Sequence, residues 1–550
     1  MSMRWPRLIT GALLGAVNVL PFLALDYLGR QWAGLPFVPF DVFDWLARVL
    51  PGRLISAGID AMVRFITAVG IGPIDSAAKR LEQLLGITIV VAGAALLGGA
   101  MALVMRRTGW RGEAVGAVTG AAVFLVVSVV DTELRAPIAV HPALALLWLL
   151  LVIVGWSASL GAWLGSRELS AIGGDATEGV RRDRRDFVLK IAGACLGSAL
   201  AAWGLARLVQ VGPRAAGARR VLPRFPGAAP EPGAGEAGAA QIGPTSVIEP
   251  ANMRQVVTPA PGTRPEVTPS SAFYRIDIDT LPPVLEEDTW ALEVSGLFDR
   301  PRRLTLSDLL AFPAVTQPIT LSCISNPVGG DLIGTSSWTG VPLRVVLGAL
   351  GLRPDAHALS IKAADGFYET VTRDDMLDPR TLLVYGMNGK TLAVEHGFPL
   401  RIYIPNRYGM KQPKWIVSME ALGHSELGYW EDRGWSREAR PHIVSVIDTV
   451  ANDHIQEGKV PIGGVAWAGD RGIQKVEIQV DGGPWREARL RTPPVGPLTW
   501  VLWRYDWPLV RGCHVFRARA TDGTGTLQSA VAKGTYPDGA TGFHSVTVTI

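Results

Sequence analysis

Cysteine and histidine are scarce in this sequence. Its 550 residues include only three cysteines and eight histidines. Three thiols cannot build the disulfide framework that stabilises small secreted domains. Cys323 and Cys513 lie in segments that do not resemble short stapled loops, so we expect no bond between them. No Cys-x-x-Cys-His sequence occurs, and we therefore predict no covalently attached haem.

Charged residues are also few. Asp, Glu, Lys and Arg make up 19% of the chain, whereas apolar residues make up 48%, and the net charge is only +4. So small a positive charge gives no reason to expect nucleic-acid binding. The composition is too apolar for one soluble protein and indicates a membrane part joined to a soluble part.

The apolar residues gather in N-terminal stretches long enough for membrane-spanning helices, each of which needs roughly 20 residues. The predicted spans are residues 8–28, 84–105, 114–130, 142–164 and 187–209. Residues 37–74 are amphipathic and interrupted by prolines, so we expect them to lie at the membrane interface. His141 is the only histidine before His357, so the spans lack the histidine pair that a haem between helices needs. We interpret residues 1–210 as a transmembrane anchor domain that offers a docking site to a quinone or redox partner.

Basic residues predict the orientation of the spans. Arginines precede the first span, separate the second from the third, and precede the fifth. With five spans all of them fall on one side, which places the N-terminus in the cytoplasm and residues beyond 210 in the periplasm or outside the cell. Residues 184–190 (RRDFVLK) also resemble a twin-arginine export motif, which precedes domains that fold with a cofactor before export. An export motif and a simple positive anchor predict the same topology, and both stay open.

The composition changes twice after the last predicted span. Residues 211–269 are rich in Pro, Gly and Ala, which predicts a flexible linker. Residues 270–440 mix short strand and helix patterns, which predicts an α+β domain. Residues 441–550 are nearly all strand-like and have a suitable length for one immunoglobulin-like β-sandwich. The predicted fold is therefore a multi-domain chain with an α-helical membrane domain of about five spans, an α+β domain and a β-sandwich.

Several short motifs follow one another in the α+β region. They are residues 271–275 (SAFYR), 321–326 (LSCISN), 338–343 (WTGVPL), 387–389 (MNG), 395–401 (EHGFPLR) and 408–415 (YGMKQPKW). In this order they resemble the sulfite oxidase family of molybdopterin enzymes, which includes sulfite dehydrogenases and periplasmic protein-methionine-sulfoxide reductases. The resemblance covers about residues 270–550. It implies a molybdenum–molybdopterin cofactor and oxygen-atom transfer coupled to a two-electron change at the metal.

The resemblance also implies roles for individual residues. Cys323 would ligate molybdenum, and Tyr368 would face it. The predicted cofactor-binding residues are Ser271, Tyr274, Arg275, Asp365, His396, Arg401, Lys411, Gln412, Pro413 and Lys414. Arginine and lysine suit the pterin phosphate. The arginine guanidinium can form two parallel hydrogen bonds to it, and the lysine ammonium supplies a point charge. Purely structural roles stay open for several of these residues. His396 is also compatible with a hydrogen-bonded histidine in a turn, and Lys411 and Lys414 with solvated surface charges. Asp365 and Tyr368 are also compatible with an ordinary turn that packs an aromatic ring.

The sequence departs from the family at one place. In sulfite-oxidising members an arginine follows the Cys-x-x-Asn motif, but here Pro327 and Val328 follow it. Without this charge-assisted contact a small dianion binds more weakly, which puts sulfite in doubt and leaves a neutral sulfoxide or another small oxyanion open.

We predict a membrane-anchored oxidoreductase that acts outside the cytoplasm on a small sulfur-containing or related substrate. Electrons would pass between this enzyme and a separate haem protein or quinone. The alternative is a non-catalytic, membrane-anchored binding or scaffold protein that retains the fold. A homodimer formed through the sandwich also stays open.

Overall fold

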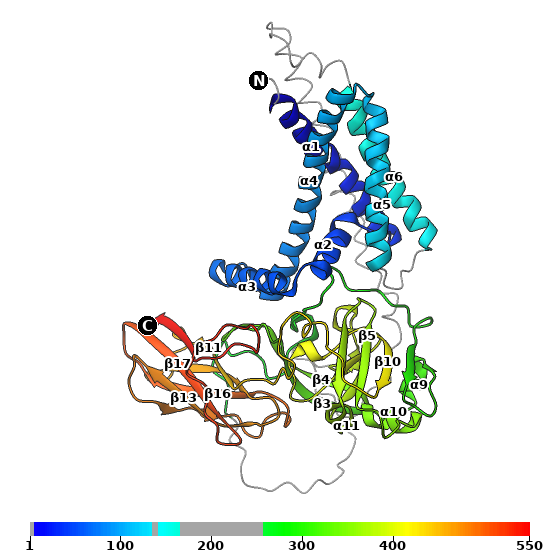
Figure 1. Ribbon diagram of the computed structural model, residues 1–550. Helices are drawn as coiled ribbons and strands as arrows, with labels where there is room; N and C mark the ends of the chain where they lie inside the picture. Colours follow the sequence, from blue (N-terminus) through cyan, green and yellow to red (C-terminus); the bar gives the residue numbers. More distant parts are fainter. Residues whose placement is uncertain (1–4, 135–140, 166–256) are drawn as a thin grey trace, which may run out of the picture. The chain divides into compact units, whose positions relative to one another are not determined.

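The computed structural model describes residues 5–134, 141–165 and 257–550 (Figure 1). The chain divides into two compact units. The first comprises Met1–Leu50, Lys79–Ala216 and Asp277–Val284, and the second comprises Pro51–Ala78, Gly217–Ile276 and Leu285–Ile550. The predicted fifth span, the twin-arginine-like segment, Cys195 and most of the predicted linker lie outside the described residues.

The first unit is built mainly from long apolar helices. They are α1 (Trp5–Ala33), α2 (Val38–Val49), the greater part of α4 (Ile74–Thr108), α5 (Gly112–Leu134) and α6 (Pro142–Gly165). Within the described ranges, four helices, α1, α4, α5 and α6, are long and apolar enough to cross a membrane. The first four predicted spans fall within these helices, which supports insertion of this unit into a membrane.

Glycines allow these helices to approach closely. A Cβ atom at Gly98 of α4 would overlap the carbonyl oxygen of Gly11 in α1. Gly161 of α6 faces the carbonyl oxygen of Gly112 in α5 in the same way. Contacts between backbones through small residues are typical of helix pairs in membranes, where no hydrophobic effect drives association.

The larger part of the second unit is an α+β domain with two five-stranded sheets. One sheet has the order β2-β1-β10-β5-β6, and the other has the order β3-β4-β7-β8 with β9 paired to β7. The strands are β1 (Leu292–Gly296), β2 (Arg303–Leu304), β3 (Val315–Ser322), β4 (Ile333–Pro342), β5 (Ala358–Ala363), β6 (Tyr368–Thr372), β7 (Leu382–Met387), β8 (Lys390–Thr391), β9 (Arg401–Tyr403) and β10 (Ile416–Leu422). The helices are η2 (Ser270–Ala272), α9 (Leu306–Leu310), α10 (Leu343–Leu350), α11 (Arg373–Leu377), η3 (Val394–His396) and η4 (Gly409–Lys411). This arrangement agrees with the α+β domain predicted from the sequence.

Local sequence explains where these elements begin. The side chain of Thr305 accepts a hydrogen bond from the Asp308 amide at the start of α9, and Asp308 bonds back to the Thr305 amide. This reciprocal capping box satisfies two amides that a helix end otherwise leaves unpaired. Strands β3 and β4 pair in register from Val315–Gly340 to Ser322–Ile333. Residues 323–332 form the loop that connects the two strands, and Cys323 begins that loop.

The C-terminal part of the second unit consists of two four-stranded sheets, with orders β11-β12-β16-β15 and β14-β13-β17-β18. Their strands are β11 (Val444–Val450), β12 (Lys459–Trp467), β13 (Ile473–Val480), β14 (Arg486–Glu487), β15 (Arg489–Leu490), β16 (Val501–Pro508), β17 (Cys513–Asp522) and β18 (His544–Thr549). Residues from both sheets, among them Val460, Trp503 and Phe516, share one buried core. An immunoglobulin-like topology for this sandwich remains our proposal.

Two further segments belong to the second unit. The described chain resumes at Val257, and Arg264 forms an ion pair of 2.6 Å with Asp448 of β11. The last residues of the predicted linker are therefore ordered against the sandwich. Helix α3 (Gly52–Val69), from the region predicted to lie at the membrane interface, also belongs to this unit.

Candidate active site around Cys323

The loop that carries Cys323 is held together by its own backbone. The Cys323 amide donates to the Leu332 carbonyl at 2.9 Å, and the Leu332 amide donates to the Asn326 side-chain oxygen at 3.0 Å. The Cys323 Sγ lies 3.0 Å from the Ser325 hydroxyl. Only 7% of Cys323 is exposed, and burial raises the pKa of its thiol. A thiol in such a place becomes a thiolate when a metal ion replaces its proton.

A glycine brings three distant segments together at this thiol. A Cβ atom at Gly409 would lie 3.0 Å from the Tyr274 hydroxyl and 3.9 Å from the Cys323 Cα. The absence of a side chain at Gly409 therefore allows η4 to approach both residues. Burial raises the pKa of Tyr274, and the nearby Cys323 adds to this effect. Tyr274 and Cys323, both predicted site residues, thus lie close together.

Arg401 is a buried cation without a carboxylate partner. It begins β9, is 5% exposed, and donates one hydrogen bond to the His396 carbonyl at 3.1 Å. Its guanidinium lies 4.9 Å from the centre of the Trp338 ring. No Asp or Glu among the described residues forms an ion pair with it, and burial lowers its pKa to about 10. A buried charge of this kind is costly unless an anion reaches it.

His396 is buried beside two cationic side chains. Its Nε2 lies 2.9 Å from the Ser270 carbonyl, and since a carbonyl only accepts, this nitrogen carries the proton. Burial lowers the pKa of His396 to about 4, with Arg401 and Lys414 contributing. The imidazole is therefore neutral at physiological pH. His396 meets a carbonyl as a structural turn histidine does, yet it lies in a cationic setting that suits an anion.

Lys414 belongs to the same cationic group. A Cβ atom at Gly397 would lie 3.1 Å from the Cβ atoms of both Arg401 and Lys414. The Lys414 ammonium donates to the Glu395 carbonyl at 3.2 Å and lies 4.3 Å from the centre of the Trp415 ring. Gly397 has a φ of 108°, a conformation that favours glycine. This turn therefore brings the side chains of Arg401 and Lys414 close to each other and to His396.

Lys411 lies in a different setting from the one predicted. Its ammonium donates to Glu369 at 2.8 Å and also contacts Glu431, and all three side chains are buried. Burial raises the pKa of Glu369 to about 7, although the Lys411 ammonium beside it acts in the opposite direction. The structure thus pairs Lys411 with carboxylates, and its role in cofactor binding stays a prediction.

Tyr368 directly precedes Glu369, which belongs to the group formed with Lys411 and Glu431. Its hydroxyl lies 2.5 Å from Asp432, and the side chain is partly exposed. Burial raises the pKa of Tyr368, and the hydrogen bond to Asp432 raises it further. Tyr368 therefore stays protonated, with its proton directed to a carboxylate. No contact joins it to Cys323 within the described residues, and its catalytic role stays a prediction.

The remaining predicted residues hold the backbone around the site. Gln412 is buried and donates to the carbonyls of Ile404 and Arg407, and the Pro413 carbonyl accepts from the Ile402 amide. The Asp365 side chain accepts from the Phe367 amide at 3.0 Å, which is an ordinary turn contact.

The segment of the SAFYR motif is partly open. Ser271 lies in η2 and is exposed, so its hydroxyl is accessible. The Arg275 amide donates to Asp75 at 2.9 Å.

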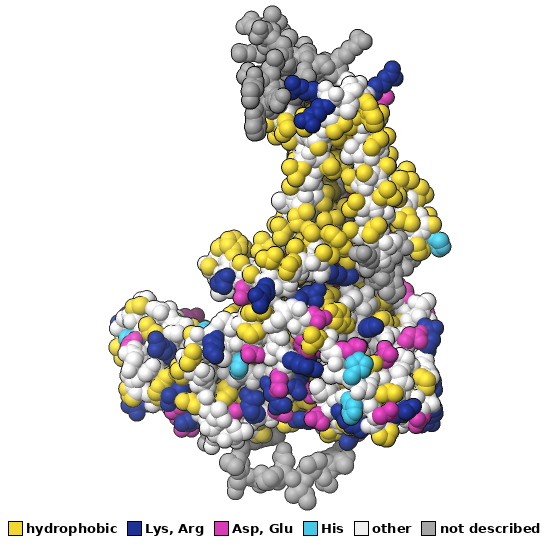
Figure 2. Space-filling model, viewed as in Figure 1, with side chains coloured by type: hydrophobic (Ala, Val, Ile, Leu, Met, Phe, Trp, Pro, Cys, Tyr) yellow, Lys and Arg dark blue, Asp and Glu magenta, His cyan; other side chains and the backbone are white. Residues whose placement is uncertain are grey.

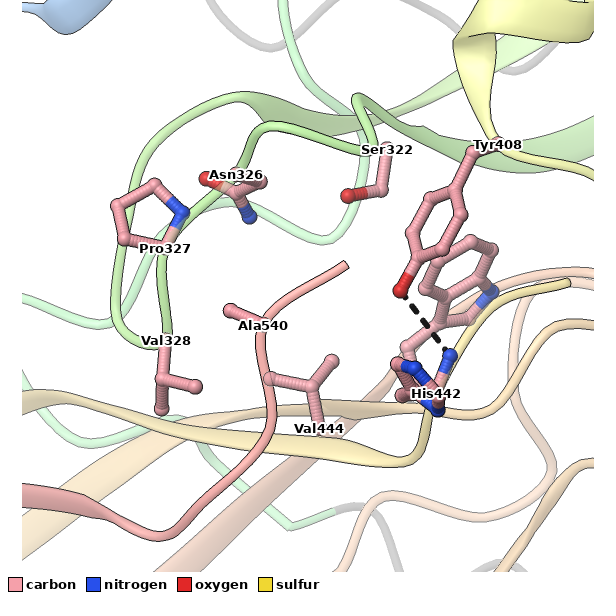
Figure 3. A pocket seen from close by; sticks show the side chains of 9 residues that line it. Ser322, Asn326, Pro327, Val328, Tyr408, His442, Val444 and Ala540 are labelled. Atoms are coloured by element: carbon pink, nitrogen blue, oxygen red, sulfur yellow. Dashed lines mark hydrogen bonds between the residues drawn. The ribbon is translucent and has the colours of Figure 1, made fainter. Parts of the chain in front are cut away.

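A small pocket runs along the Cys323 loop (Figure 3). It is lined by Ser322, Asn326, Pro327, Val328, Tyr408, His442, Val444, Trp467 and Ala540. Figure 3 shows the loop residues on one side and Val444 and His442 on the other. The pocket therefore lies between the α+β domain and the sandwich, next to the residues that flank Cys323.

The lining of this pocket is polar but carries no full charge at neutral pH. Burial lowers the pKa of His442, which keeps its ring neutral, and raises the pKa of Tyr408 to about 12. The Tyr408 hydroxyl accepts from the His442 amide at 3.0 Å. Trp467 is 4% exposed, and its indole N–H has no hydrogen-bond partner in the part of the chain that the structure describes. The pocket thus offers donors to a neutral acceptor.

Three contributors were missed from the sequence. Asn388 donates to the Thr268 carbonyl and the Ser270 hydroxyl, and so fixes the segment that His396 contacts. The MNG motif pointed to it, and its positive φ of 50° fits an asparagine in a turn. Trp338, whose buried indole N–H also has no partner among the residues described, packs against Arg401 and belongs to the WTGVPL motif. Trp467 had no such signal, because only the folded chain brings its strand to the loop.

Comparison with known proteins gives the family. Residues 279–430 match the family described as "Oxidoreductase molybdopterin binding domain". The chain is 29% identical to sulfite oxidase of Arabidopsis thaliana over 280 residues, which are 42% of this chain and 71% of that protein. It is 31% identical to the uncharacterized oxidoreductase YuiH of Bacillus subtilis over 160 residues, which are 29% of this chain and 79% of that protein.

A third relative is named for a different substrate. The chain is 35% identical to the putative protein-methionine-sulfoxide reductase subunit YedZ1 of Azospira oryzae over 176 residues. These are 32% of this chain and 63% of that protein. The fold, the site and these matches together define a molybdopterin-binding oxidoreductase. The chain belongs to the sulfite oxidase family.

The described residues fit the cofactor that this family implies. Among the described residues, Arg401 is a buried cation without an anionic partner, and the Trp338 indole N–H beside it has no acceptor. A pyranopterin phosphate supplies both an anion and acceptor oxygens. The buried thiol of Cys323 is a soft ligand of the type that suits such a metal once it is deprotonated. Arg401, Lys414 and Trp338 are therefore our candidates for the pterin side, and Cys323 for the metal.

The low pKa of His396 predicts a pH effect on the cofactor-free protein. Its folded pKa of about 4 lies below the ordinary value of 6.5, so the unfolded chain gains a proton first as the pH falls. The free energy of unfolding should therefore drop between pH 6.5 and pH 4, by up to about 3 kcal/mol. Thermal unfolding of His396→Gln should show a smaller drop than the wild type. His424→Gln, at an exposed histidine, should match the wild type, and parallel curves for all three proteins would contradict the burial effect.

Proposed function

We propose that this chain is a membrane-anchored molybdopterin oxidoreductase that reduces a small neutral sulfoxide outside the cytoplasm. The observation that carries the choice of substrate is the neutral pocket beside Cys323, where Pro327 and Val328 replace the arginine of sulfite-oxidising relatives. A sulfoxide has one strong acceptor oxygen and apolar substituents. It matches a pocket whose lining includes both hydrogen-bond donors and the apolar side chains of Pro327, Val328 and Ala540.

The reaction has a simple balance. One sulfoxide, two electrons and two protons give one thioether and one water. The chemistry that the molybdenum cofactor supplies when bound is the two-electron change coupled to oxygen-atom transfer. Electrons would come from a separate haem protein or from a quinol, because this chain has no Cys-x-x-Cys-His motif.

The residues of the chain contribute binding and orientation. We infer that Cys323 holds the metal and that Arg401 and Lys414 hold the anionic end of the pterin. The Trp467 indole and the Asn326 amide would hold the sulfoxide oxygen by hydrogen bonds. The Asn326 amide nitrogen is suited to this, because the Asn326 oxygen is already used by the Leu332 amide.

The outward location rests on the distribution of arginines along the chain. Basic residues lie between α4 and α5, whereas Asp131 and Glu133 precede α6. This asymmetry follows the positive-inside rule and supports a catalytic domain outside the cytoplasm.

The function is tested with the full-length protein purified from cells supplied with molybdate. We expect molybdenum and pterin in the sample, and reduction of dimethyl sulfoxide or methionine sulfoxide by reduced viologen. We expect little oxidation of sulfite with ferricyanide as acceptor. A protein that contains neither molybdenum nor pterin, or that oxidises sulfite faster than it reduces any sulfoxide, would overturn the proposal.

The pocket itself is tested by two substitutions of tryptophan. Trp467→Phe removes a donor and should raise KM for the sulfoxide by about 2- to 10-fold, the usual worth of one neutral hydrogen bond. Trp503→Phe is the matched control, because the Trp503 indole is also buried and has no partner within the described ranges, but lies in the sandwich core. Equal effects of the two substitutions would show that the pocket does not bind the substrate.

A third variant tests the selectivity of the pocket. Val328→Arg introduces a cation into the pocket wall and should improve kcat/KM for sulfite relative to the sulfoxide. An arginine contact to an anion is among the stronger hydrogen bonds in proteins. Unchanged selectivity in a protein that still holds molybdenum would remove Val328 from the substrate site.

A further inference from the structure

One face of α3 is bound to the second unit. Ser56 and Ile66 are buried, the Trp435 indole donates to the Ser56 hydroxyl at 3.1 Å, and the Thr535 hydroxyl donates to Asp60 at 2.9 Å. These contacts join α3 both to the end of the α+β domain and to the sandwich. The helix is thus a fixed part of this unit, although 188 positions of the sequence separate its end at Val69 from Val257, where the described part of the chain resumes (257 − 69 = 188).

The opposite face of α3 is apolar and exposed. Leu54 is 61% exposed, Phe65 is 52% and Val69 is 59%. With Gly58 and Ala61 they recur every three or four residues, which places them along one stripe of the helix. Ile71, 46% exposed, follows directly after the helix end. A contiguous exposed apolar stripe marks a surface that contacts another apolar phase.

The chain itself indicates what covers this stripe. Helix α3 lies between α1 and α4, both long and apolar enough to cross a membrane, and only residues 70–73 separate it from α4. So short a connection keeps the end of α3 close to the start of a span. Arg53 and Arg64 are exposed at the edge of the stripe, where they suit anionic lipid headgroups (Figure 2 shows hydrophobic and basic side chains together over α3).

We propose that α3 lies flat in the headgroup region of the bilayer, with its apolar stripe in the lipid, and fixes the cofactor domain on the membrane surface. The membrane spans alone would only tether the cofactor domain to the bilayer. Helix α3 would in addition fix the distance of that domain from the membrane surface and its orientation. The segment that follows α3 also reaches the active site. The Ile74 amide donates to Asp331 of the Cys323 loop at 3.1 Å, and Asp75 accepts from the Arg275 amide.

The proposal is tested by fluorescence quenching on the full-length protein in lipid nanodiscs. A fluorescent amino acid is incorporated at Phe65, and as a matched control at Thr67, which is exposed on the polar side of the same helix. Lipids with brominated acyl chains should quench the label at position 65 and leave that at position 67 bright. Aqueous iodide should quench position 67 and leave position 65 bright. Neither measurement requires catalysis, so its outcome is independent of the proposed function.

Two results would overturn the proposal. Quenching of position 65 by iodide and not by lipid would show a water-exposed helix. Protection of position 65 from both quenchers would show that a protein surface, such as a second copy of this chain, covers the stripe. Leu54→Glu combined with Val69→Glu should abolish lipid quenching at position 65 while the molybdenum content stays unchanged. Retained lipid quenching in that variant would also contradict the proposal.

Discussion

Replacing Cys323 by serine should abolish molybdenum-dependent turnover. The thiol is buried at the end of β3, and a hydroxyl is a much poorer ligand than a thiolate for a soft metal. Even second-sphere changes at metal sites cost roughly 10- to 100-fold in activity or affinity, so loss of a ligand should cost more than about 100-fold. Sulfoxide reduction with a viologen donor, together with molybdenum analysis of the same sample, measures the effect.

The matched control uses the other described cysteine. Cys513 is free and exposed in the sandwich, so Cys513→Ser should leave both activity and molybdenum content unchanged. Full activity of Cys323→Ser at normal molybdenum content would show that another residue ligates the metal. Inactivity of Cys513→Ser would show instead that thiols matter through the stability of the fold.

Replacing Arg401 by methionine should have opposite effects on the cofactor-free and the cofactor-loaded protein. Burial lowers the pKa of Arg401 from 12.5 to about 10, so below pH 10 its charge destabilises the folded cofactor-free state. The penalty is on the order of 3 kcal/mol, and the methionine should remove much of it. In the loaded protein the same change removes a charge-assisted contact to the pterin, which weakens retention by about 10- to 100-fold. Thermal unfolding of both forms and pterin analysis measure the two effects.

The control for this comparison is an exposed arginine of the same domain. Arg353 forms an exposed pair with Asp355 at 3.2 Å, and Arg353→Met should change stability in both forms by less than about 0.5 kcal/mol. If Arg401→Met lowered the unfolding temperature of both forms equally, Arg401 would be a structural cation and not the anion site. The Arg401→Lys variant should retain part of the cofactor, because lysine keeps the positive charge but cannot form the two parallel hydrogen bonds of a guanidinium.

The sequence predicted the elements of the fold better than the contacts between them. Four predicted spans and the two C-terminal regions agree with described elements, because apolar runs and strand alternation are local signals. The approach of Tyr274 to Cys323 was predicted only through family motifs. The partners of Lys411 were not predicted, because Glu369 lies 42 residues away and pairs only through folding. The same reason hid Trp467 and the ordered residues from Val257 onward.

The hydrogen bonds of Asn388 have a consequence for how the protein is made. Its amide reaches the Thr268 carbonyl, 120 residues earlier in the chain, and its oxygen accepts from Ser336 and Ser337 of β4. Closing a loop of that length carries an entropic cost that is repaid only once β4 and β7 are paired. We therefore expect residues 268–275 to dock last during folding. Until then the domain would be open on the side of His396, which gives a bulky cofactor a way in before the chain closes.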